Sequence, residues 1–431
     1  MSEDISYSKN EKIGTLAGIL FGHFSDGYDL VIISYLFFPL SIHFGTSIAV
    51  IAIALTISLV FSAFGGIIFG WIADRHGRKI GLMLSIAVFG FATLLTGTVN
   101  AIWQLYLLRA IEGLGIGGEW GIGFAQLTEV WSPKWRATGG GVLQGVFIMG
   151  SIAGAFTGGY MITAFGPAIG WRYALMVAGA VALAGVVVIK IVMPESKYWK
   201  SYRKKLEAGG AETARKEKIP ILQIFSPQVR KWTLFSLLIG GANLFIYFSY
   251  ASFMPTLLAT AYALKPNQYT EILVAGQAIA VPFYWINGLL SDRFGRKITA
   301  ISYGLVYTIA VVLFFVSILD KIPYVALLAF PLFYTYTIVS IGQGISGEYG
   351  VCYSEHFPTR MRSTATNFGY MVGRGAAGAM ASLIIPIMYS GFGGLKFLGI
   401  AMSIAMLVGA IVQLIGLFGL KETKGTVVTV D

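Results

Sequence analysis

The sequence predicts an all-α integral membrane protein with twelve transmembrane helices in two homologous six-helix bundles. A soluble fold is excluded by composition, because 56% of the residues are hydrophobic and 12% are charged, whereas soluble domains carry about 25% charged residues. Twelve apolar stretches are long enough to cross a bilayer. A basic loop also occurs twice, as Gly70–Lys79 and again, 218 positions later, as Gly288–Lys297. Repetition at half the chain length indicates two related halves.

Each span is predicted from its length and apolar character. A helix needs about 20 mostly apolar residues to cross the hydrocarbon core, and it satisfies its backbone polar groups internally. The spans of the first half are 14–43, 48–73, 80–98, 103–129, 138–164 and 171–193. The spans of the second half are 233–260, 271–291, 298–319, 323–350, 363–389 and 394–419. We therefore expect one bundle over 1–193, a cytoplasmic connector over 194–231, and a second bundle with a short cytoplasmic tail over 232–431.

The basic residues are distributed unevenly between the two sides. With the N-terminus placed inside, Arg109 and Arg374 fall within spans, and 25 of the 31 Lys and Arg residues fall on the inner side. The outer side holds four, which are Arg172, Lys265, Lys321 and Lys396. Such a bias sets orientation, so we expect a multi-pass protein of the cell membrane with both termini cytoplasmic. The basic face is expected to meet anionic lipid, not nucleic acid.

No cofactor or metal site is expected. The lone Cys352 permits no internal disulfide and no multi-cysteine metal site. The run Gly113–Gly118 lies within a membrane span, whereas a dinucleotide-binding loop follows a strand; small residues there let helices approach closely. The chain has no P-loop, zinc-protease or nucleophile-elbow motif. We expect a transporter driven by a gradient, not an enzyme, and expect it to be monomeric.

Two further motifs repeat in the same order. Gly118-Glu119-Trp120-Gly121 matches Gly347-Glu348-Tyr349-Gly350, and the Glu129/Arg136 pair matches the Glu355/Arg362 pair. Parallel halves related by an axis along the membrane normal are one known transporter architecture.

These motifs resemble the major facilitator superfamily. The pattern G-x-x-x-D-R-x-G-R-K after spans 2 and 8 resembles its loop signature, and Arg109 with the following glycines resembles its span-4 motif. The Glu-x6-Arg pairs, Pro194-Glu195-Ser196 and Glu422-Thr423-Lys424-Gly425 resemble its sugar-porter branch. The resemblance covers nearly the whole chain and implies twelve helices and alternating-access transport.

The branch is indicated by spans 1, 4 and 11. Asp26-Gly-Tyr-Asp29 resembles the D-G-[FY]-D of aromatic-acid and sialate proton symporters, and Glu119-Trp120-Gly121 with Tyr370-Met-Val-Gly373-Arg374 resembles the sialate and lactate/pyruvate branch. The paired glutamines of sugar porters are missing from span 7. The resemblance therefore implies an organic anion carried with a proton.

Arg374 is the leading candidate for substrate binding. It is ten residues into span 11, about 15 Å deep, and its guanidinium fits a carboxylate through two hydrogen bonds. Counting from the paired arginines puts Ile148 at its place in the first half. The alternative is a structural ion pair with Glu348 or another acid.

Four acids are candidates for proton coupling. Asp26 and Asp29 are one helical turn apart in span 1, with His23 a turn earlier; one aspartate is expected to pair with Arg109 and the other to titrate, the assignment being open. Glu112 either neutralises Arg109 or joins in coupling. Glu119 and its repeat partner Glu348 suggest a site or gate between the halves, or a packing role within each half.

Charged residues at the cytoplasmic loops are predicted to form a gate latch. A loop carboxylate can face a helix N-terminus of the other half, and loop arginines can pair with the glutamates at neighbouring helix ends. The alternative is charge that only sets topology. The residues are Asp74, Arg75, Arg78, Glu129, Arg136, Asp292, Arg293, Arg296, Glu355 and Arg362.

Polar and aromatic side chains within spans complete the expected pocket. They are Gln144, Asn243, Tyr247, Gln277, Tyr284, Gln343, Asn367 and Tyr370. The function predicted is proton-coupled symport of a small carboxylate. The alternatives are a sugar, polyol or phosphate symporter, and a membrane receptor without transport, for which the expected connector is short.

Overall fold

The computed structural model describes residues 6–208 and 220–425. The helices of the first half are α1 (Lys9–Tyr35), α2 (Phe37–Phe44), α3 (Ile48–His76), α4 (Arg78–Thr96), α5 (Ile102–Val130), η1 (Pro133–Trp135) and α6 (Arg136–Val192). The connector contains α7 (Lys197–Ala208) and α9 (Pro220–Gln223). The helices of the second half are α10 (Arg230–Ala251), α11 (Met254–Ala261), α12 (Pro266–Phe294), α13 (Arg296–Asp320), η2 (Leu327–Ala329), α14 (Pro331–Gly342), η3 (Gln343–Ile345), α15 (Ser346–His356), η4 (Thr359–Met361), α16 (Arg362–Asn367), η5 (Phe368–Val372), α17 (Gly373–Gly391), η6 (Leu395–Phe397) and α18 (Leu398–Phe418).

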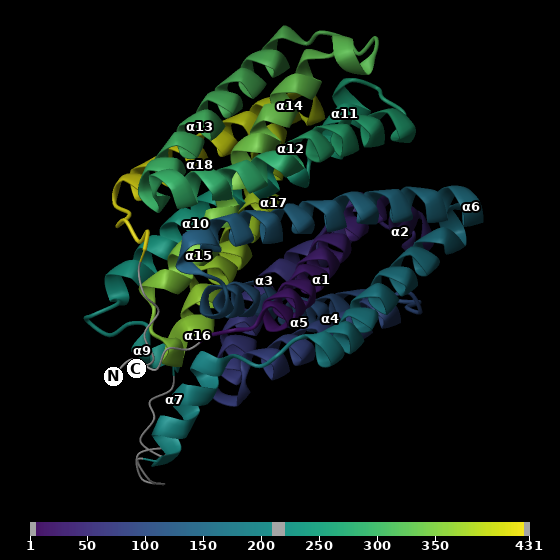
Figure 1. Ribbon diagram of the computed structural model, residues 1–431. Helices are drawn as coiled ribbons and strands as arrows, with labels where there is room; N and C mark the ends of the chain where they lie inside the picture. The colour runs from purple at the N-terminus through teal and green to yellow at the C-terminus, as the bar shows by residue number, and fades with distance from the viewer. Residues whose placement is uncertain (1–5, 209–219, 426–431) are drawn as a thin grey trace.

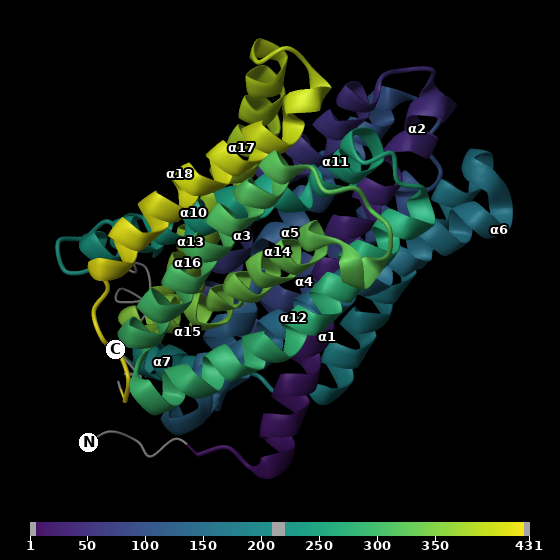
Figure 2. The ribbon, with the colours of Figure 1, turned by 90° about the horizontal axis from the view of Figure 1, so that it is seen from above.

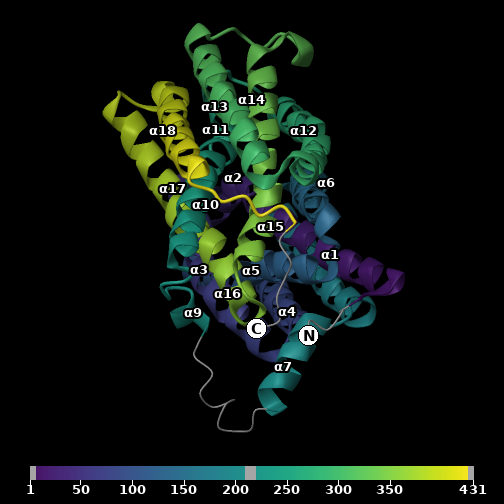
Figure 3. The same cartoon turned by 60° about the vertical axis from the view of Figure 1, so that its left-hand side comes forward.

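The two halves form two bundles that lie side by side. They meet at the side that carries α7 and α9, which we name the connector side, and diverge toward α2 and α11 (Figures 1 and 3). Across the boundary, α12 packs on α6, α3 on α16 and α17, and α15 on α5 and α6. Within the second half, α10, α17 and α18 lie together at one edge (Figure 2).

Nine helical segments of the described chain are long and apolar enough to cross a membrane. One of them, Pro133–Val192, covers two predicted spans, because the chain turns at Gly166 with φ +75° and continues as helix. Only glycine adopts that conformation readily. Helix α5 is continuous but carries several charges, and the predicted span 323–350 is broken into α14, η3 and α15. The count of twelve stays a prediction.

Glycines set the spacing between α3 and α5. A Cβ on Gly65 would lie 1.9 Å from the carbonyl oxygen of Leu114, and one on Gly113 would lie 2.2 Å from that of Ser58. Both obstacles are backbone atoms, so the helices would have to separate. The run of small residues in span 4 therefore serves helix packing.

We expect Gly65→Ala to destabilise the protein by about 1–3 kcal/mol, the usual effect of overpacking. Gly159→Ala is the matched control, because nothing lies within 4 Å of a Cβ added there and alanine favours helix. Thermal unfolding in detergent should show a lower melting temperature for Gly65→Ala and an unchanged or higher one for Gly159→Ala. Equal melting of the two variants would contradict the close-packing argument.

The two copies of the motif Gly-Glu-Trp/Tyr-Gly do not occupy equivalent positions in the two halves. The structurally equivalent residues lie about one helical turn from those that the matching letters pair. A Cβ on Gly121 would contact Asn367, and a Cβ on Gly347 would contact Gly141. Gly347 follows Gly121 by 226 positions, and Asn367 follows Gly141 by 226 positions, so these contacts are equivalent. Glu129 and Glu355 have the same separation.

The correction changes the partner of two predicted acids. At a separation of 226 positions, Glu119 corresponds to Ile345, and Glu348 corresponds to Ile122. The prediction that Glu119 and Glu348 are repeat partners was therefore wrong. The matching letters predict the wrong register, because a shift of one helical turn leaves a side chain on nearly the same face of the helix.

Candidate substrate cavity and latch

A narrow cavity lies between the two bundles. Helices α1, α5 and α6 line it from the first half, and α10, α12, η3, η5 and α17 line it from the second. Its lining side chains are Asp26, Leu30, Trp120, Gln144, Phe147, Ile148, Leu244, Tyr247, Phe248, Tyr284, Gln343, Tyr370 and Arg374. One cation, one carboxylate and six aromatic rings thus face the same space.

Arg374 and Asp26 form an ion pair across the cavity. Nη1 donates to Oδ2 and Nη2 to Oδ1, both at 3.3 Å, so the pair is bidentate but longer than the 2.7–2.9 Å typical of charged hydrogen bonds. Arg374 is 3% exposed and Asp26 is fully buried. Each residue comes from a different half. The partner of Arg374 is therefore Asp26, not Glu348.

The backbone before Arg374 is locally altered. The π-helix η5 ends at Val372, and Gly373 opens α17 with its added Cβ only 2.7 Å from the amide nitrogen of Gly241. Such a π-turn rotates the residues that follow it and occurs often at functional sites. Ile148, which holds the equivalent place in the first half, also lines the cavity. The two halves therefore contribute different side chains at this equivalent position, arginine in the second and isoleucine in the first.

Aromatic rings form the connector-side part of the cavity wall. Trp120 stacks on Tyr370 with ring centroids 3.7 Å apart and planes 7° from parallel. Its indole Nε1 donates to Gln144 Oε1 at 3.1 Å. The stacked rings of Trp120 and Tyr370 thus form a contact between the two halves. The sequence did not single out Trp120, because an aromatic residue in a membrane span is usually explained by packing.

A second cavity continues from the first, away from the connector side. The two cavities share Leu30, Tyr247 and Phe248. Tyr35 and Tyr336, which sequence reasoning missed, line the second one. Gln277 also lies there and donates to Tyr336 Oη at 3.3 Å. From Arg374, the two cavities thus extend toward the side where the bundles diverge.

Three residues predicted for the substrate site, Asn243, Glu348 and Asn367, lie outside these cavity walls. Asn243 exchanges hydrogen bonds with Gln343, at 3.0 and 3.1 Å, and stands behind it. Glu348 is buried on α15 beside Ser291 of α12, within the second bundle. Asn367 accepts from the amide of Gly121 at 2.8 Å and joins the halves on the connector side.

The second aspartate of span 1 stays within the first half. Arg109 lies 3.9 Å from Asp29 and 3.6 Å from Glu112, and it donates to Thr93. The carboxylate oxygens of Asp29 and Glu112 have no hydrogen-bond partner among the residues described. Two buried acids therefore share one arginine.

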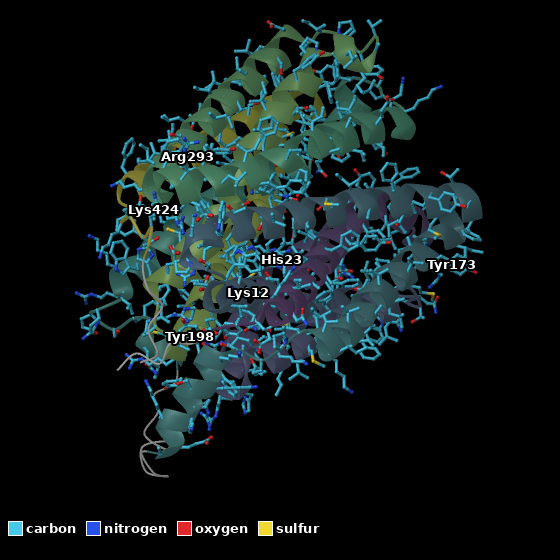
Figure 4. The ribbon with its side chains drawn as sticks, in the orientation of Figure 1. Lys12, His23, Tyr173, Tyr198, Arg293 and Lys424 are labelled. Atoms are coloured by element: carbon cyan, nitrogen blue, oxygen red, sulfur yellow. The ribbon has the colours of Figure 1, made fainter. Side chains whose placement is uncertain are left out.

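His23 and Glu119 form a further buried pair. His23 Nδ1 lies 2.6 Å from Glu119 Oε1, and both side chains are fully buried. His23 comes from α1, in the interior of the first bundle (Figure 4). Asp26 is one turn along the same helix, so the two pairs are neighbours.

Two aspartates bind helix N-termini across the connector-side interface. Asp74 accepts hydrogen bonds from the amides of Ser363 and Thr364 and from the Thr364 hydroxyl, at 2.7–3.1 Å. Asp292 accepts the same three bonds from Ala137 and Thr138, at 2.7–3.1 Å. Carboxylates suit the positive end of a helix dipole. Each half thus caps a helix of the other.

Glutamates and arginines reinforce this contact. Glu129 accepts from Arg78 at 2.9 Å, from Arg362 of the other half at 2.7 Å and from Ser196 at 2.5 Å. Arg78 also donates to the backbone carbonyl of Thr359, at 2.8 Å.

The second half repeats the arrangement around Glu355. It accepts from Arg296 at 3.2 Å and from Thr423 at 2.6 Å, and lies 3.6 Å from Arg136 of the first half. We name the whole set of contacts around Asp74, Asp292, Glu129 and Glu355 the latch.

Two arginines predicted for the latch lie outside it. Arg75 is exposed and stacks over Trp71, and Arg293 is exposed and stacks over Phe294. Each follows its aspartate by one residue, and one helical step turns the side chain by about 100°. Arg293 instead lies at the edge of the molecule beside Lys424, whose ammonium donates to its carbonyl (Figure 4).

Sequence reasoning missed the glutamates that cap α4 and α13. Glu195 accepts from the amides of Arg78 and Lys79, and Glu422 from those of Arg296 and Lys297. Partial burial raises the pKa of Glu422, but hydrogen bonds from backbone amides outweigh it and leave the pKa below its usual value. The signal that could have found them is their place in the motifs Pro194-Glu195-Ser196 and Glu422-Thr423-Lys424-Gly425.

Comparison with known proteins agrees with this architecture. A sequence profile of the Major Facilitator Superfamily matches residues 19–382. The cis,cis-muconate transport protein of Acinetobacter baylyi is 28% identical, over 83% of this chain and 83% of its own length. The sialic acid transporter NanX of Escherichia coli is 26% identical, over 87% of this chain and 86% of its own.

A solved structure of the proton:xylose symporter XylE superposes with a TM-score of 0.80 and covers 98% of both chains at 17% identity. That likeness shows the shared fold. The profile spans most of the sequence, and the relatives align over most of their own lengths. The chain therefore belongs to the Major Facilitator Superfamily and is a multi-pass membrane transporter.

Proposed function

We propose that the protein carries a small organic anion together with a proton, by alternating access. The observation that carries this proposal is the Arg374–Asp26 pair, a buried cation and acid from opposite halves that line one cavity. A buried ionisable pair inside a membrane protein is costly and marks transport pathways.

The pair supplies a mechanism for coupling. A substrate carboxylate needs the same face of Arg374 that Asp26 occupies. Protonation neutralises Asp26 and frees the guanidinium fork for the substrate. Proton and anion then favour each other's binding, and the coupling must be reciprocal. Asp29, held near Arg109 with Glu112, serves structure in this scheme.

The side chains that line the cavity favour a substrate whose carboxylate is attached to a flat, largely apolar group. Trp120, Tyr370 and Phe147 offer ring faces close to Arg374, and Gln144 and Gln343 offer hydrogen bonds. Relatives of the chain are described as transporters of muconate, sialic acid and niacin. A sugar or phosphate remains the alternative cargo, and a ligand sensor the alternative class.

The latch defines one state of the transport cycle. It joins the halves at the connector side, while the cavities lead to the opposite side. We propose that the connector side is cytoplasmic, so this state faces outward. Protease treatment of right-side-out vesicles should spare residues around α7 and digest them only after permeabilisation; digestion in sealed vesicles would reverse the orientation.

Uptake into proteoliposomes tests the function. An acid-outside gradient should drive accumulation of radiolabelled muconate or another planar carboxylate, chemically unaltered. Unlabelled benzoate or lactate should compete, whereas glucose and phosphate should not. If only glucose competed, the substrate would be a sugar and not an organic anion. A ligand that binds but never accumulates would indicate a sensor.

We expect Asp26→Asn to uncouple transport from protons. The variant leaves Arg374 free of its acid at every pH, so anion binding should lose its pH dependence and gradient-driven accumulation should fall at least tenfold. Exchange of substrate across the membrane should continue. Asp29→Asn is the control, since binding should stay pH-dependent there. Unchanged proton-driven accumulation by Asp26→Asn would overturn the coupling role.

A further inference from the structure

Glu348 is a buried acid that the transport scheme above does not use. It lies on α15 with 1% exposure, and neither carboxylate oxygen has a hydrogen-bond partner within the described ranges. It is absent from the lining of both interface cavities. An unpartnered carboxylate in a protein interior needs a physical explanation.

Two further unpartnered polar residues accompany it. Asn287 and Ser291 are one turn apart on α12 and are fully buried. Both amide atoms of Asn287 and the hydroxyl of Ser291 also lack partners in the part of the chain described.

The level of these residues follows from a close helix contact. A Cβ on Gly344 would lie 3.5 Å from the Cα of Tyr284, and α15 packs on α12. Glu348 lies four residues beyond Gly344, and Asn287 lies three residues beyond Tyr284. The two residues are therefore at about the same level, because both helices run toward the connector side. The Ser291 hydroxyl lies beside the Glu348 carboxyl, although the two do not meet the geometry of a hydrogen bond. The Ser291 and Glu348 side chains therefore adjoin each other inside the second bundle, with Asn287 one turn along α12 from Ser291.

The nearby cation is already engaged. Arg296 donates to Asp292 at 2.8 Å and to Glu355 at 3.2 Å. The titratable and charged groups that interact electrostatically with Glu348 are Asp292, Arg296, Tyr303, Tyr349, Cys352 and Glu422. Ionised Glu348 would thus be one more negative charge beside an arginine that two carboxylates share. Neutral amide and hydroxyl groups offset little of the several kcal/mol that burying such a charge costs.

We propose that Glu348, with Asn287 and Ser291, is a second proton-binding site, located in the second half and outside the substrate cavity. The site holds its proton while the latch is closed and releases it when the latch opens. It is separate from the Arg374–Asp26 pair and stands whatever substrate the cavity takes.

Charge links the site to the latch. Deprotonated Glu348 competes with Glu355 and Asp292 for Arg296, and so weakens contacts that hold the connector side shut. By reciprocity, opening the latch favours release of the proton, because water then reaches the carboxylate. Low pH on the connector side therefore stabilises the closed latch.

Carbodiimide labelling of the purified full-length protein tests the proposal, because this reagent modifies protonated carboxyl groups in apolar surroundings. Mass spectrometry should find Glu348 modified, with labelling that falls as the pH rises. Glu355→Gln, which loosens the latch and frees Arg296 to stabilise ionised Glu348, should lower the midpoint by about one pH unit, a tenfold change in proton affinity. Glu348→Gln should lose the label. Labelling of Glu348 with the same midpoint in Glu355→Gln would overturn the link to the latch.

Infrared spectroscopy covers the case in which the reagent fails to reach the site. At neutral pH, Glu348→Gln should remove a protonated-carboxyl stretching band that the wild type shows. No lost band would mean that Glu348 is ionised, and would overturn the proposal. Protection of Glu348 by sodium chloride, but not by choline chloride, at fixed pH would also overturn it, because the site would then hold sodium.

Discussion

Arg374→Ala is expected to abolish accumulation of the anionic substrate while the protein still folds. Truncating one partner of a buried, hydrogen-bonded charge pair costs about 2–5 kcal/mol in binding, which corresponds to roughly 30- to 5,000-fold weaker affinity. Asp26 need not unfold the protein, because its carboxyl can take a proton once the guanidinium is gone. Uptake of labelled carboxylate, and ligand-induced thermal shift in detergent, measure the effect.

Two companion variants separate charge from geometry. Arg374→Lys keeps the positive charge but loses the planar fork, so it should bind the anion with intermediate affinity. Arg374→Ala combined with Asp26→Asn removes both ionisable groups; its melting temperature should match or exceed that of Arg374→Ala, and its uptake should stay absent. Wild-type KM for a carboxylate in Arg374→Ala would refute the role of the cation.

The architecture was accessible from sequence because two strong signals agree. Apolar length predicts spans, and the duplicated loop marks the homologous halves. The family match, the helical structure and the similarity to a solved transporter confirm the fold class. The number of spans is harder, because charges in α5 and the break at Gln343–Ile345 weaken two of them. Hydropathy alone therefore leaves the count a prediction.

Pairings across the halves were less accessible. Depth in the helix singled out Arg374, but its partner depends on the relative rotation of α1 and α17, which are 348 positions apart in that contact. Asp26 and Asp29 differ by three residues and look alike in sequence. Packing turns Asp26 toward the second half and leaves Asp29 beside Arg109 in the first half. The latch was easier to foresee, because each half repeats the same residues at the same helix ends.

Register was the least accessible feature. The motif Gly-Glu-Trp/Tyr-Gly aligns by its letters, yet glycine contacts place the two copies one turn apart. Consistent with this shift, Glu119 pairs with His23 in the first half, whereas Glu348 has no hydrogen-bond partner among the described residues of the second. An approximate repeat thus hides functional asymmetry, since equivalent positions carry Glu119 and Ile345, or Arg374 and Ile148.

Among substitutions of the latch glutamates, Glu129→Gln should destabilise the closed state the most. In Glu129→Gln, Arg78 and Arg362 lose their shared negative partner. Removing one partner of a buried ion pair costs about 3–5 kcal/mol. Because Arg362 belongs to the other half, part of that cost falls on the closed state alone. Even about 2 kcal/mol would shift the conformational equilibrium roughly thirtyfold.

A cysteine placed in the interface can report that shift. Ser363 is fully buried at the latch, and its hydroxyl has no partner in residues 6–208 and 220–425, so Ser363→Cys in a Cys352→Ser background is a mild change. Maleimide should label this thiol slowly in the parent and at least tenfold faster in Glu129→Gln. Transport should fall as the balance between states is lost.

Glu355→Gln provides the matched comparison, because the two glutamates are equivalent in the repeat but differ across the interface. Glu129 contacts Arg362 at 2.7 Å, whereas Glu355 lies 3.6 Å from Arg136. Coulomb attraction and hydrogen bonding both weaken over that distance, so Glu355→Gln should accelerate labelling less than Glu129→Gln. Equal acceleration would mean that the aspartate caps, which are alike in both halves, hold the latch, and Asp74→Asn should then produce the larger opening.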